Sequence, residues 1–246
     1  MSTLDIKGDA LRIFNVLNDG GIAIIPNDAG YALMGGSAEA VQKIFNAKRR
    51  GSHKRNAMLC SMETQRELHV LDSRSREMID AITRDFDLTL GAVAPYRADH
   101  PLMAKLDSDL LKGSTANGTL AMLLNAGQLF DEVCRLCREA VLPVFGSSAN
   151  LSGTGPRFRV EDIQPEILDV ADITVDYGLR KHHIYRRSAT IMRFGNGDPE
   201  CLRIGSCYEL IADVLKRFFN VELPPDPGHD ANPSGHLQEF ALRDAS

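Results

Sequence analysis

The sequence predicts an α/β protein with a mixed sheet. Short apolar stretches typical of strands alternate with amphipathic stretches typical of helices along most of the chain. Near the end, Gly195-Asn196-Gly197-Asp198 separates two strand patterns and predicts a hairpin, which adds an antiparallel pair to the sheet. No internal repeat is evident, so we expect a single domain over residues 1–223.

Turn residues mark the ends of the first predicted elements. The amphipathic residues 11–17 run into Asp19-Gly20-Gly21, which ends a helix, and the apolar run 22–25 stops at Pro26. Ser37 is placed to cap the next helix, because its hydroxyl can accept a hydrogen bond from the first helical turn. Further patterns in this half predict strands at 58–60, 88–93 and 119–124 and helices at 73–82 and 102–111.

The second half continues the alternation and then changes character. An amphipathic helix over 128–139 leads into an apolar strand at 141–145. The patterns that follow predict a helix at 160–168, strands at 173–175, 189–192 and 201–204, and a last helix at 207–218. From Pro224 the chain is rich in Pro, Gly and polar residues, so we expect a tail over 224–246 that wraps the surface or is disordered.

Composition limits the classes of function. The 246 residues, 43% hydrophobic and 25% charged, can bury the core of a globular α/β protein. The net charge of −5 argues against a strongly basic nucleic-acid surface but allows local basic patches at 48–55 and 180–187. No apolar run approaches membrane-spanning length and the N-terminus lacks a signal-peptide layout, so we expect a cytoplasmic protein without a membrane partner.

The cysteines and histidines do not predict a metal centre. Five cysteines without regular spacing make a poor disulfide framework. Cys134 and Cys137 form a CxxC pair within a predicted helix, and two partly buried thiols on one helix face are favoured over a zinc or redox site. His182-His183 lies in a basic loop, where solvated or anion-facing histidines are more typical than metal ligands. We expect no metal site made of protein side chains alone.

Two polar segments about a hundred residues apart carry the clearest functional signal. Lys48-Arg49-Arg50-Gly51-Ser52-His53-Lys54 gathers cations where a predicted helix ends. Residues 146–153 offer hydroxyls, an amide and main-chain N–H groups directly after a predicted strand. Cations with short donors near the backbone are what a polyphosphate needs. Each segment alone also has a purely structural explanation, since cations favour helix ends and small residues favour turns.

The motifs taken together resemble the YrdC-like family, whose best-known members are threonylcarbamoyl-AMP synthases acting in tRNA modification. Lys48, Arg50 and Lys54 match its Lys-x-Arg-x-x-x-Lys motif, and residues 148–153 match Ser-x-Asn-Leu-Ser-Gly. Residues 188–191 are similar to its Ser-Thr-Val-Val strand, and 202–205 match Leu-Arg-x-Gly. The likeness runs from about Gly20 to Gly205. It implies a twisted mixed sheet flanked by helices around an open, positively charged cavity.

The chain departs from the family on the side that the family uses for threonine. Where the family has Pro-Thr-Asp-Thr-Val-Tyr-Gly-Leu, this chain has residues 26–33, and the second Thr is Ala29. A family arginine falls at Leu123 and a family histidine at Leu59. A slip of register, with Arg97, Lys105 or Lys112 as the cation, is the alternative. We favour real divergence, because three separate positions changed together.

The resemblance also implies roles for particular residues. On the nucleotide side these are Lys48, Arg50, Lys54, Thr119, Ser148, Asn150 and Arg203. The acceptor, or threonine-side, pocket would consist of Ala29, Tyr31, Leu59, Leu123, Ser148 and Ser188. No catalytic side chain is assigned, because transfer in this family depends on positioning and charge neutralisation. The implied substrate is ATP with magnesium, with no tightly bound cofactor.

Three functions remain open on the sequence. The first is synthesis of threonylcarbamoyl-AMP from threonine, bicarbonate and ATP, with release of pyrophosphate, for tRNA modification. The second is carbamoyl-adenylate chemistry with another acceptor or a carbamoyl-type donor, which a more apolar pocket would suit. The third is a non-catalytic protein that binds a nucleotide or double-stranded RNA, which the net charge of −5 makes less attractive.

Overall fold

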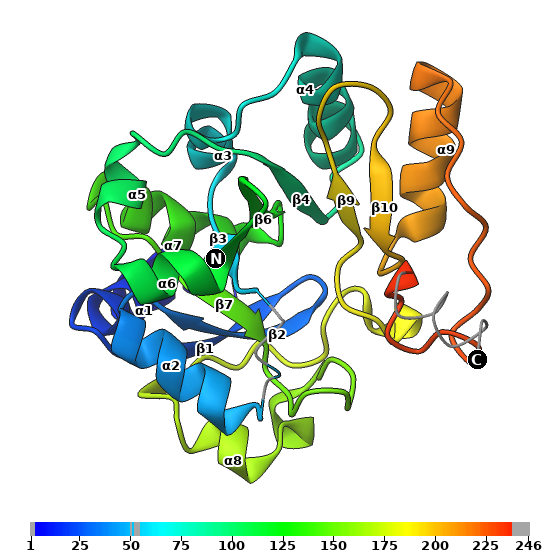
Figure 1. The fold of residues 1–246 in the computed structure, drawn as a ribbon. Coiled ribbons are helices and arrows are strands. Elements are labelled where there is room, and N and C mark those ends of the chain that lie inside the picture. The colour runs from blue at the N-terminus through cyan, green and yellow to red at the C-terminus, as the bar shows by residue number, and fades with distance from the viewer. Residues whose placement is uncertain (1–2, 50, 52–54, 238–246) are drawn as a thin grey trace.

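The structure is a computed structural model, and it describes residues 3–49, 51 and 55–237. A mixed sheet of ten strands forms its centre (Figure 1). The strands are β1 (Ile22–Asn27), β2 (Gly30–Gly35), β3 (Ala57–Leu59), β4 (Leu90–Pro95), β5 (Thr115–Ala116), β6 (Thr119–Leu124), β7 (Phe145–Ser148), β8 (Ile173–Thr174), β9 (Ile191–Arg193) and β10 (Glu200–Arg203). The α-helices are α1 (Ile6–Asn18), α2 (Ala38–Ala47), α3 (Met62–Leu68), α4 (Ser73–Asp80), α5 (Pro101–Ala104), α6 (Ser108–Ser114), α7 (Gln128–Glu139), α8 (Pro165–Leu168) and α9 (Tyr208–Phe219).

The sheet order is β10-β9-β4-β6-β3-β7-β2-β1-β8, and β5 pairs with β6 off this path. β7 lies between β3 and β2 and is antiparallel to both. The pairs β3–β6, β4–β9 and β1–β8 are parallel, so the sheet is mixed as the sequence predicts. The hairpin is confirmed too, because β9 and β10 pair antiparallel around residues 195–198.

Helices cover both faces of the sheet, and β1 shows why. Its side chains alternate, as they must in a strand. Ala23 and Ile25 belong to the apolar cluster that also holds residues of α1 and α7, while Ile22 and Ile24 belong to the cluster with α2 and α8. All six residues of β1 are buried for this reason. A third and larger cluster packs α4 and α9 against the part of the sheet formed by β4, β6 and β9.

Several elements differ from the sequence predictions, each for a local reason. β1 continues through Pro26 to Asn27, since the proline pairs with Tyr31 in an antiparallel hairpin. The helix expected at 102–111 is two short helices, because the side chain of Asp107 accepts from the N–H of Leu110 and starts α6. The strand expected at 141–145 begins only at Phe145, after Val141 with a φ of 50°.

β2, α3 and the short strand β5 were absent from the sequence predictions. β2 pairs with β1 on one side and β7 on the other, and α3 follows β3 directly, capped by Ser61.

The helix pattern at 160–168 is a 3-10 turn (Val160–Asp162) followed by α8, which begins with Pro165. α4 continues into a π-helical turn (Ala81–Asp85), beyond the predicted end of that helix.

Residues 224–237 pack on the domain beside β10 and α9, in the orange and red part of the ribbon (Figure 1). The hydroxyl of Tyr208 donates to the carbonyl of Pro224, and His236 forms a bridge with Arg203. Of the two possibilities expected for the tail, residues 224–237 therefore follow the first and wrap the surface of the domain. Residues 238–246 lie outside the described part of the chain.

Candidate functional site

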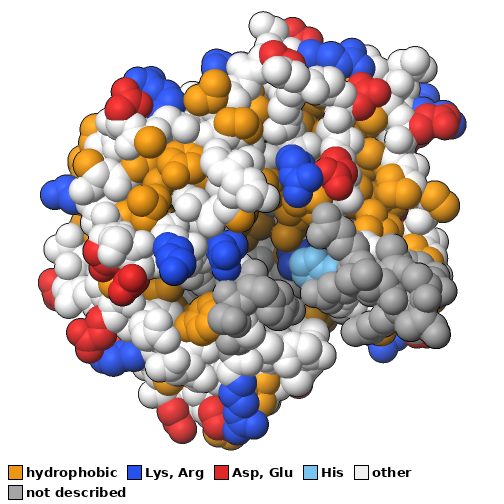
Figure 2. Space-filling model, in the orientation of Figure 1, with side chains coloured by type: hydrophobic (Ala, Val, Ile, Leu, Met, Phe, Trp, Pro, Cys, Tyr) orange, Lys and Arg blue, Asp and Glu red, His pale blue; other side chains and the backbone are white. Residues whose placement is uncertain are grey.

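A cavity of about 1220 Å³ opens where the central strands meet the loops that follow them. Figure 2 shows a hollow near the middle of this face, with Lys and Arg side chains and a histidine at its edge. Its walls come from β2, β3, β6 and β7, the loops at 150–158 and 186–189, and the C-terminal residues. Segments that are far apart in the sequence therefore meet in one site.

The turn after β7 is fixed by a buried lysine. Lys48, 1% exposed, lies just after α2, and its ammonium donates to the main-chain carbonyl of Ser148 and, at 2.6 Å, to that of Asn150. The carbonyl of Lys48 in turn accepts from the N–H of Ser152 at 3.0 Å. Bonds from an ionised donor are about twice as strong as neutral ones. Lys48 thus organises the turn that the sequence assigns to the nucleotide.

Asn150 offers an acceptor within this turn. Its Nδ2 donates to the carbonyl of Leu151 at 2.6 Å, while its Oδ1 is buried and has no hydrogen-bond partner among the described residues. A buried polar atom without a partner is costly, and four of the seven such side-chain atoms among the described residues belong to residues of the cavity lining. Because Asn150 lines the cavity, a ligand that donates to Oδ1 would remove this cost.

Two further motifs cross beside the turn. The guanidinium of Arg203 donates twice to the carbonyl of Ala189, at 3.0 and 2.7 Å. Gly205 donates to the hydroxyl of Thr190 at 3.1 Å, and a Cβ at this glycine would lie 2.2 Å from the carbonyl oxygen of Ser188. The glycine therefore allows the two segments to approach, and this brings Ser188 and Arg203 into the same cavity wall.

The acceptor side of the cavity is apolar. Ala29, Leu59 and Leu123 all line it, and the side chain of Leu59 packs against Gly146. Tyr31 also lines it, but its hydroxyl donates to Asp176 and to the carbonyl of Gly178, each at 2.8 Å. Burial, together with the hydrogen bond to Asp176, raises the pKa of Tyr31 to about 12, so the phenol stays neutral.

The described cavity lining is strongly cationic. Only one acidic residue, Asp162, belongs to it, against six lysines and arginines and two histidines. The basic members are Lys48, Arg55, Arg157, Arg186, Arg187, Arg203, His229 and His236. Cations concentrated in a concave site attract anions over a distance comparable to the Debye length.

The structure brings most of the sequence-predicted site residues together. Those that line the cavity are Lys48, Ser148, Asn150, Arg203, Ala29, Tyr31, Leu59, Leu123 and Ser188. Thr119 does not line it. This residue starts β6 next to the Asn117-Gly118 turn, and its hydroxyl closes that turn by donating to the carbonyl of Ala116 at 2.7 Å. Arg50 and Lys54 lie outside the described residues.

Sequence reasoning missed the contribution of the C-terminal residues and of Arg187. Arg187 belongs to the basic patch at 180–187, for which the sequence suggested no function. Its side chain is 5% exposed. His229 and His236 stand in the stretch taken for a tail, and neither belongs to a motif. The presence of two histidines within a Pro- and Gly-rich stretch was the signal that could have indicated a role for these residues in the site.

The cysteines lie in the core. All five are buried and unpaired in disulfides, and burial raises the pKa of Cys137 to about 12. Within the described ranges, no group of three or more His, Cys, Asp or Glu side chains is arranged to hold a metal ion. In the same part of the chain, no helix is long and apolar enough to cross a membrane.

A family model described as telomere recombination and named after Sua5, YciO and YrdC matches residues 15–205. The match covers most of the 246 residues, so the chain belongs to the Sua5/YciO/YrdC family. The family assignment made from the motifs is thereby confirmed. The domain is related to threonylcarbamoyl-AMP synthases, and its family includes enzymes of carbamoyl-adenylate synthesis.

Solved structures share the fold. A hypothetical protein from Streptococcus mutans UA159 has a TM-score of 0.74 and 22% identity, over 86% of this chain and 92% of that one. P. abyssi Sua5 complexed with L-threonine has a TM-score of 0.67 and 18% identity, over 89% of this chain and 60% of its own. Full-length HypF in its phosphate- and nucleotide-bound form has a TM-score of 0.60 and 18% identity, over 84% of this chain and 30% of its own. At these identities the likeness establishes the fold, which confirms the twisted mixed sheet flanked by helices.

Proposed function

We propose that the chain binds ATP in this cavity and forms a carbamoyl-type adenylate there. The observation that carries the proposal is the turn at 148–150, which Lys48 fixes and which presents the unpartnered Oδ1 of Asn150 to a cationic cavity. The relatives support the proposal, since Sua5 was solved with L-threonine and HypF with phosphate and nucleotide.

In the proposed reaction a carbamate oxygen attacks the α-phosphorus of ATP. A new P–O bond forms as the bond to the oxygen bridging the α- and β-phosphorus breaks, and that electron pair leaves with pyrophosphate. Such a transfer needs alignment and charge neutralisation rather than a protein nucleophile. Lys48, Arg50 and Lys54 would neutralise the phosphates, Ser148 would orient the reacting one, and Arg203 would cover the nucleotide. The Oδ1 of Asn150 would accept a hydrogen bond from a hydroxyl or amino group of the nucleotide, because its Nδ2 already donates to Leu151.

Magnesium would arrive with ATP and neutralise charge on its phosphates. Asp162 is the sole carboxylate in the described cavity lining, so these residues do not build a separate metal cage. Bicarbonate would supply the carbamate carbon, or a carbamoyl-type donor would supply the group directly.

The acceptor is the part of the proposal in which this chain differs from the ordinary threonylcarbamoyl-AMP synthases. Free threonine carries a carboxylate, and an apolar wall gives that charge no partner. Ala29, Leu59 and Leu123 form such a wall, and the Tyr31 hydroxyl is already engaged. These observations favour a smaller or less charged acceptor. Modification of tRNA would follow only if the adenylate is made from threonine.

Calorimetric titration tests the proposal. ATP should bind the unmodified protein, and Asn150→Ala should weaken that binding about fivefold or more, the worth of roughly one hydrogen bond. Asn46→Ala, on the exposed face of α2, is the matched control and should leave binding unchanged. A protein that fails to bind ATP, or an Asn150→Ala variant that binds it normally, would contradict the proposal.

A second set of titrations separates the open functions. Binding of threonine with bicarbonate in the presence of ATP would indicate the threonylcarbamoyl reaction. Binding of ATP alone would indicate another acceptor. Binding of duplex RNA without either small molecule would indicate a non-catalytic RNA-binding protein.

A further inference from the structure

The residues from Asp226 to His236, here called the C-terminal wall, lie beyond the part of the chain that the family model matches. Four of them, His229, Pro233, Ser234 and His236, nevertheless line the same cavity as Asn150. The family domain therefore forms only part of the cavity boundary in this protein.

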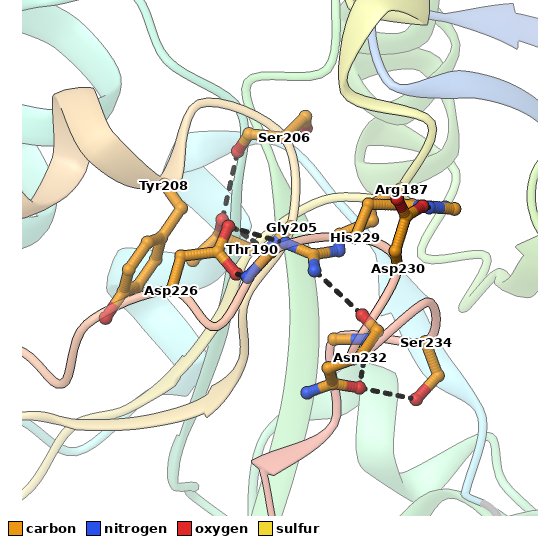
Figure 3. Close-up of polar contacts among 12 residues, drawn as sticks. Arg187, Thr190, Gly205, Ser206, Tyr208, Asp226, His229, Asp230, Asn232 and Ser234 are labelled. Carbon is orange, nitrogen blue, oxygen red and sulfur yellow. Dashed lines mark hydrogen bonds and ion pairs between the residues drawn. The ribbon is translucent and has the colours of Figure 1, made fainter. Parts of the chain in front are cut away.

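Arg187 holds this wall in place (Figure 3). One terminal nitrogen of its guanidinium donates to the carboxylate of Asp226 at 2.7 Å, and the other donates to the carbonyl of Asn232 at 2.8 Å. The Nε is buried without a hydrogen-bond partner among the described residues. Because the Arg187 side chain is 5% exposed, losing Asp226 would leave a buried charge without its partner, which is strongly destabilising.

The electrostatics of Asp226 agree with this anchoring. Burial alone would raise its pKa, but the hydrogen bond from Arg187, the N–H of Gly228 and nearby positive charge outweigh burial and lower the pKa. Asp226 is thus a carboxylate at neutral pH, and the ion pair with Arg187 persists.

Main-chain contacts also join the wall to β10 and to the residue that follows it. The N–H of Ile204 donates to the carbonyl of Gly235 at 2.8 Å, and His236 forms an antiparallel bridge with Arg203. Gly235 has a φ of 74°, and a Cβ built on it would lie 1.8 Å from the carbonyl oxygen of Ile204. The contact therefore requires glycine for both conformation and space.

The wall presents a hydrogen-bonding group beside the cationic lining. The Nδ1 of His229 is buried and has no hydrogen-bond partner among the described residues, and the Asp230 carboxylate lies 3.6 Å away, beyond hydrogen-bond range. His229 shares the cavity with Arg186, Arg187 and Arg203. An imidazole N–H among cations is suited to donate to a phosphate oxygen.

We propose that the C-terminal wall is a fixed part of the ligand site, that Arg187 and Gly235 position it, and that His229 contacts the phosphate chain of the bound nucleotide. This inference rests on the proposed binding of ATP. It adds ligand contacts from residues outside the family domain.

The first experiment displaces the wall without replacing a cavity-lining residue. Gly235→Ala should weaken ATP binding about tenfold or more in calorimetry, because the added methyl pushes the wall off β10. Gly197→Ala in the β9–β10 turn is the control, since Gly197 also has a positive φ, 108°, but a Cβ there meets open space and the residue lies outside the wall. Equal ATP affinity for the Gly235→Ala variant and the unmodified protein would overturn the proposal.

The second experiment identifies what His229 contacts. His229→Ala should weaken binding of ATP and of pyrophosphate about fivefold, the worth of one hydrogen bond, and leave adenosine binding unchanged. The same titration with AMP, which carries only the α-phosphate, shows whether the lost contact is to that phosphate or to the outer two. His183→Ala, an exposed histidine outside the cavity lining, is the control. Equal losses for adenosine and ATP, or no loss for either, would contradict the assigned contact.

A third measurement needs no nucleotide, so it separates failure of this inference from failure of the proposed function. Hydrogen–deuterium exchange at residues 226–236 should accelerate in Asp226→Asn, which removes the anchoring charge, and in Arg187→Met. Arg187→Lys should restore part of the protection, because it keeps the charge. Unchanged exchange in both anchor variants would refute the positioning role, whatever ATP does.

Discussion

The ammonium of Lys48 lies 2.6 Å from the main-chain oxygen of Asn150, across 102 positions of sequence. This contact links the end of α2 to the turn after β7, and those two places carry the two polar segments that stand out in the sequence. A lysine that looks like a surface cation in the sequence is therefore a buried cross-link within the site.

Replacing Lys48 with Met should cost stability as well as binding. The substitution leaves the carbonyls of Ser148 and Asn150 without their charged donor, so the free energy of unfolding should fall by ~3 kcal/mol. Urea unfolding measures it. Lys43→Met, which removes an exposed pair with Glu39 in the same helix, should change stability little. A loss of ATP affinity with normal stability would show that Lys48 acts only on the ligand.

The two other motif cations should behave differently from Lys48. Arg50→Ala and Lys54→Ala should each weaken ATP binding by about 1.5–3 kcal/mol, the usual worth of a charge-assisted contact. We expect the melting temperature to stay near that of the unmodified protein, because the sequence places both cations after a predicted helix, where a cation contributes little to stability. Calorimetry beside a thermal melt distinguishes these effects. Normal ATP affinity in both variants would remove the main support for the nucleotide site.

The divergent acceptor pocket can be tested by partial reconstruction. Leu123→Arg alone should not confer threonine binding, since the added charge would lack polar partners in an apolar wall. Combining it with Ala29→Thr and Leu59→His should bring threonine-dependent release of pyrophosphate from ATP above background. Robust threonine-dependent release by the unmodified protein would show instead that the apolar pocket still accepts threonine.

Asp131 in α7 predicts a pH-dependent stability. Burial, with Asp28, Asp87 and Glu63 adding negative charge, raises its pKa to about 7. A carboxyl whose pKa is higher in the folded chain holds its proton more tightly there, so its contribution to stability is lost as pH rises from about 4 to about 7. Asp131→Asn should therefore raise the free energy of unfolding at pH 8 by ~1–2 kcal/mol and have little effect near pH 4. Asp109→Asn, on the surface of α6, should show no such gain; equal gains in both variants would exclude this origin.

The fold was largely predictable because local sequence patterns indicate most of the helices and strands. The β9–β10 hairpin follows from its Asn-Gly turn, and α7 from its amphipathic pattern. β2 was missed because it begins and ends with Gly30 and Gly35, which in a sequence are typical of turns. β7 was placed too early because the apolar run before it includes Pro143, which cannot donate to the ladder, whereas the polar Ser147 and Ser148 continue the strand.

The site was predictable only where motif residues carry it. Ser148, Asn150 and Arg203 reach one cavity through strand pairing that their motifs imply. Arg187 and His229 line the same cavity because the chain after α9 folds back to it, where Asp226 binds Arg187. No local sequence pattern predicts this path of the chain. Thr119 shows the opposite case, since a motif match placed it near the nucleotide while a neighbouring turn engages its hydroxyl.

The position of β7 has a consequence for how the protein is made. Among the described strands, β7 joins the group β2, β1 and β8 to the group β3, β6, β4, β9 and β10. During synthesis, β2 and β3 must each wait with an open edge until residues 145–148 have left the ribosome, and open edges invite association with other chains. The same four residues lead directly into the turn that carries Asn150, so a nascent chain joins the two groups of strands and forms this turn in a single step.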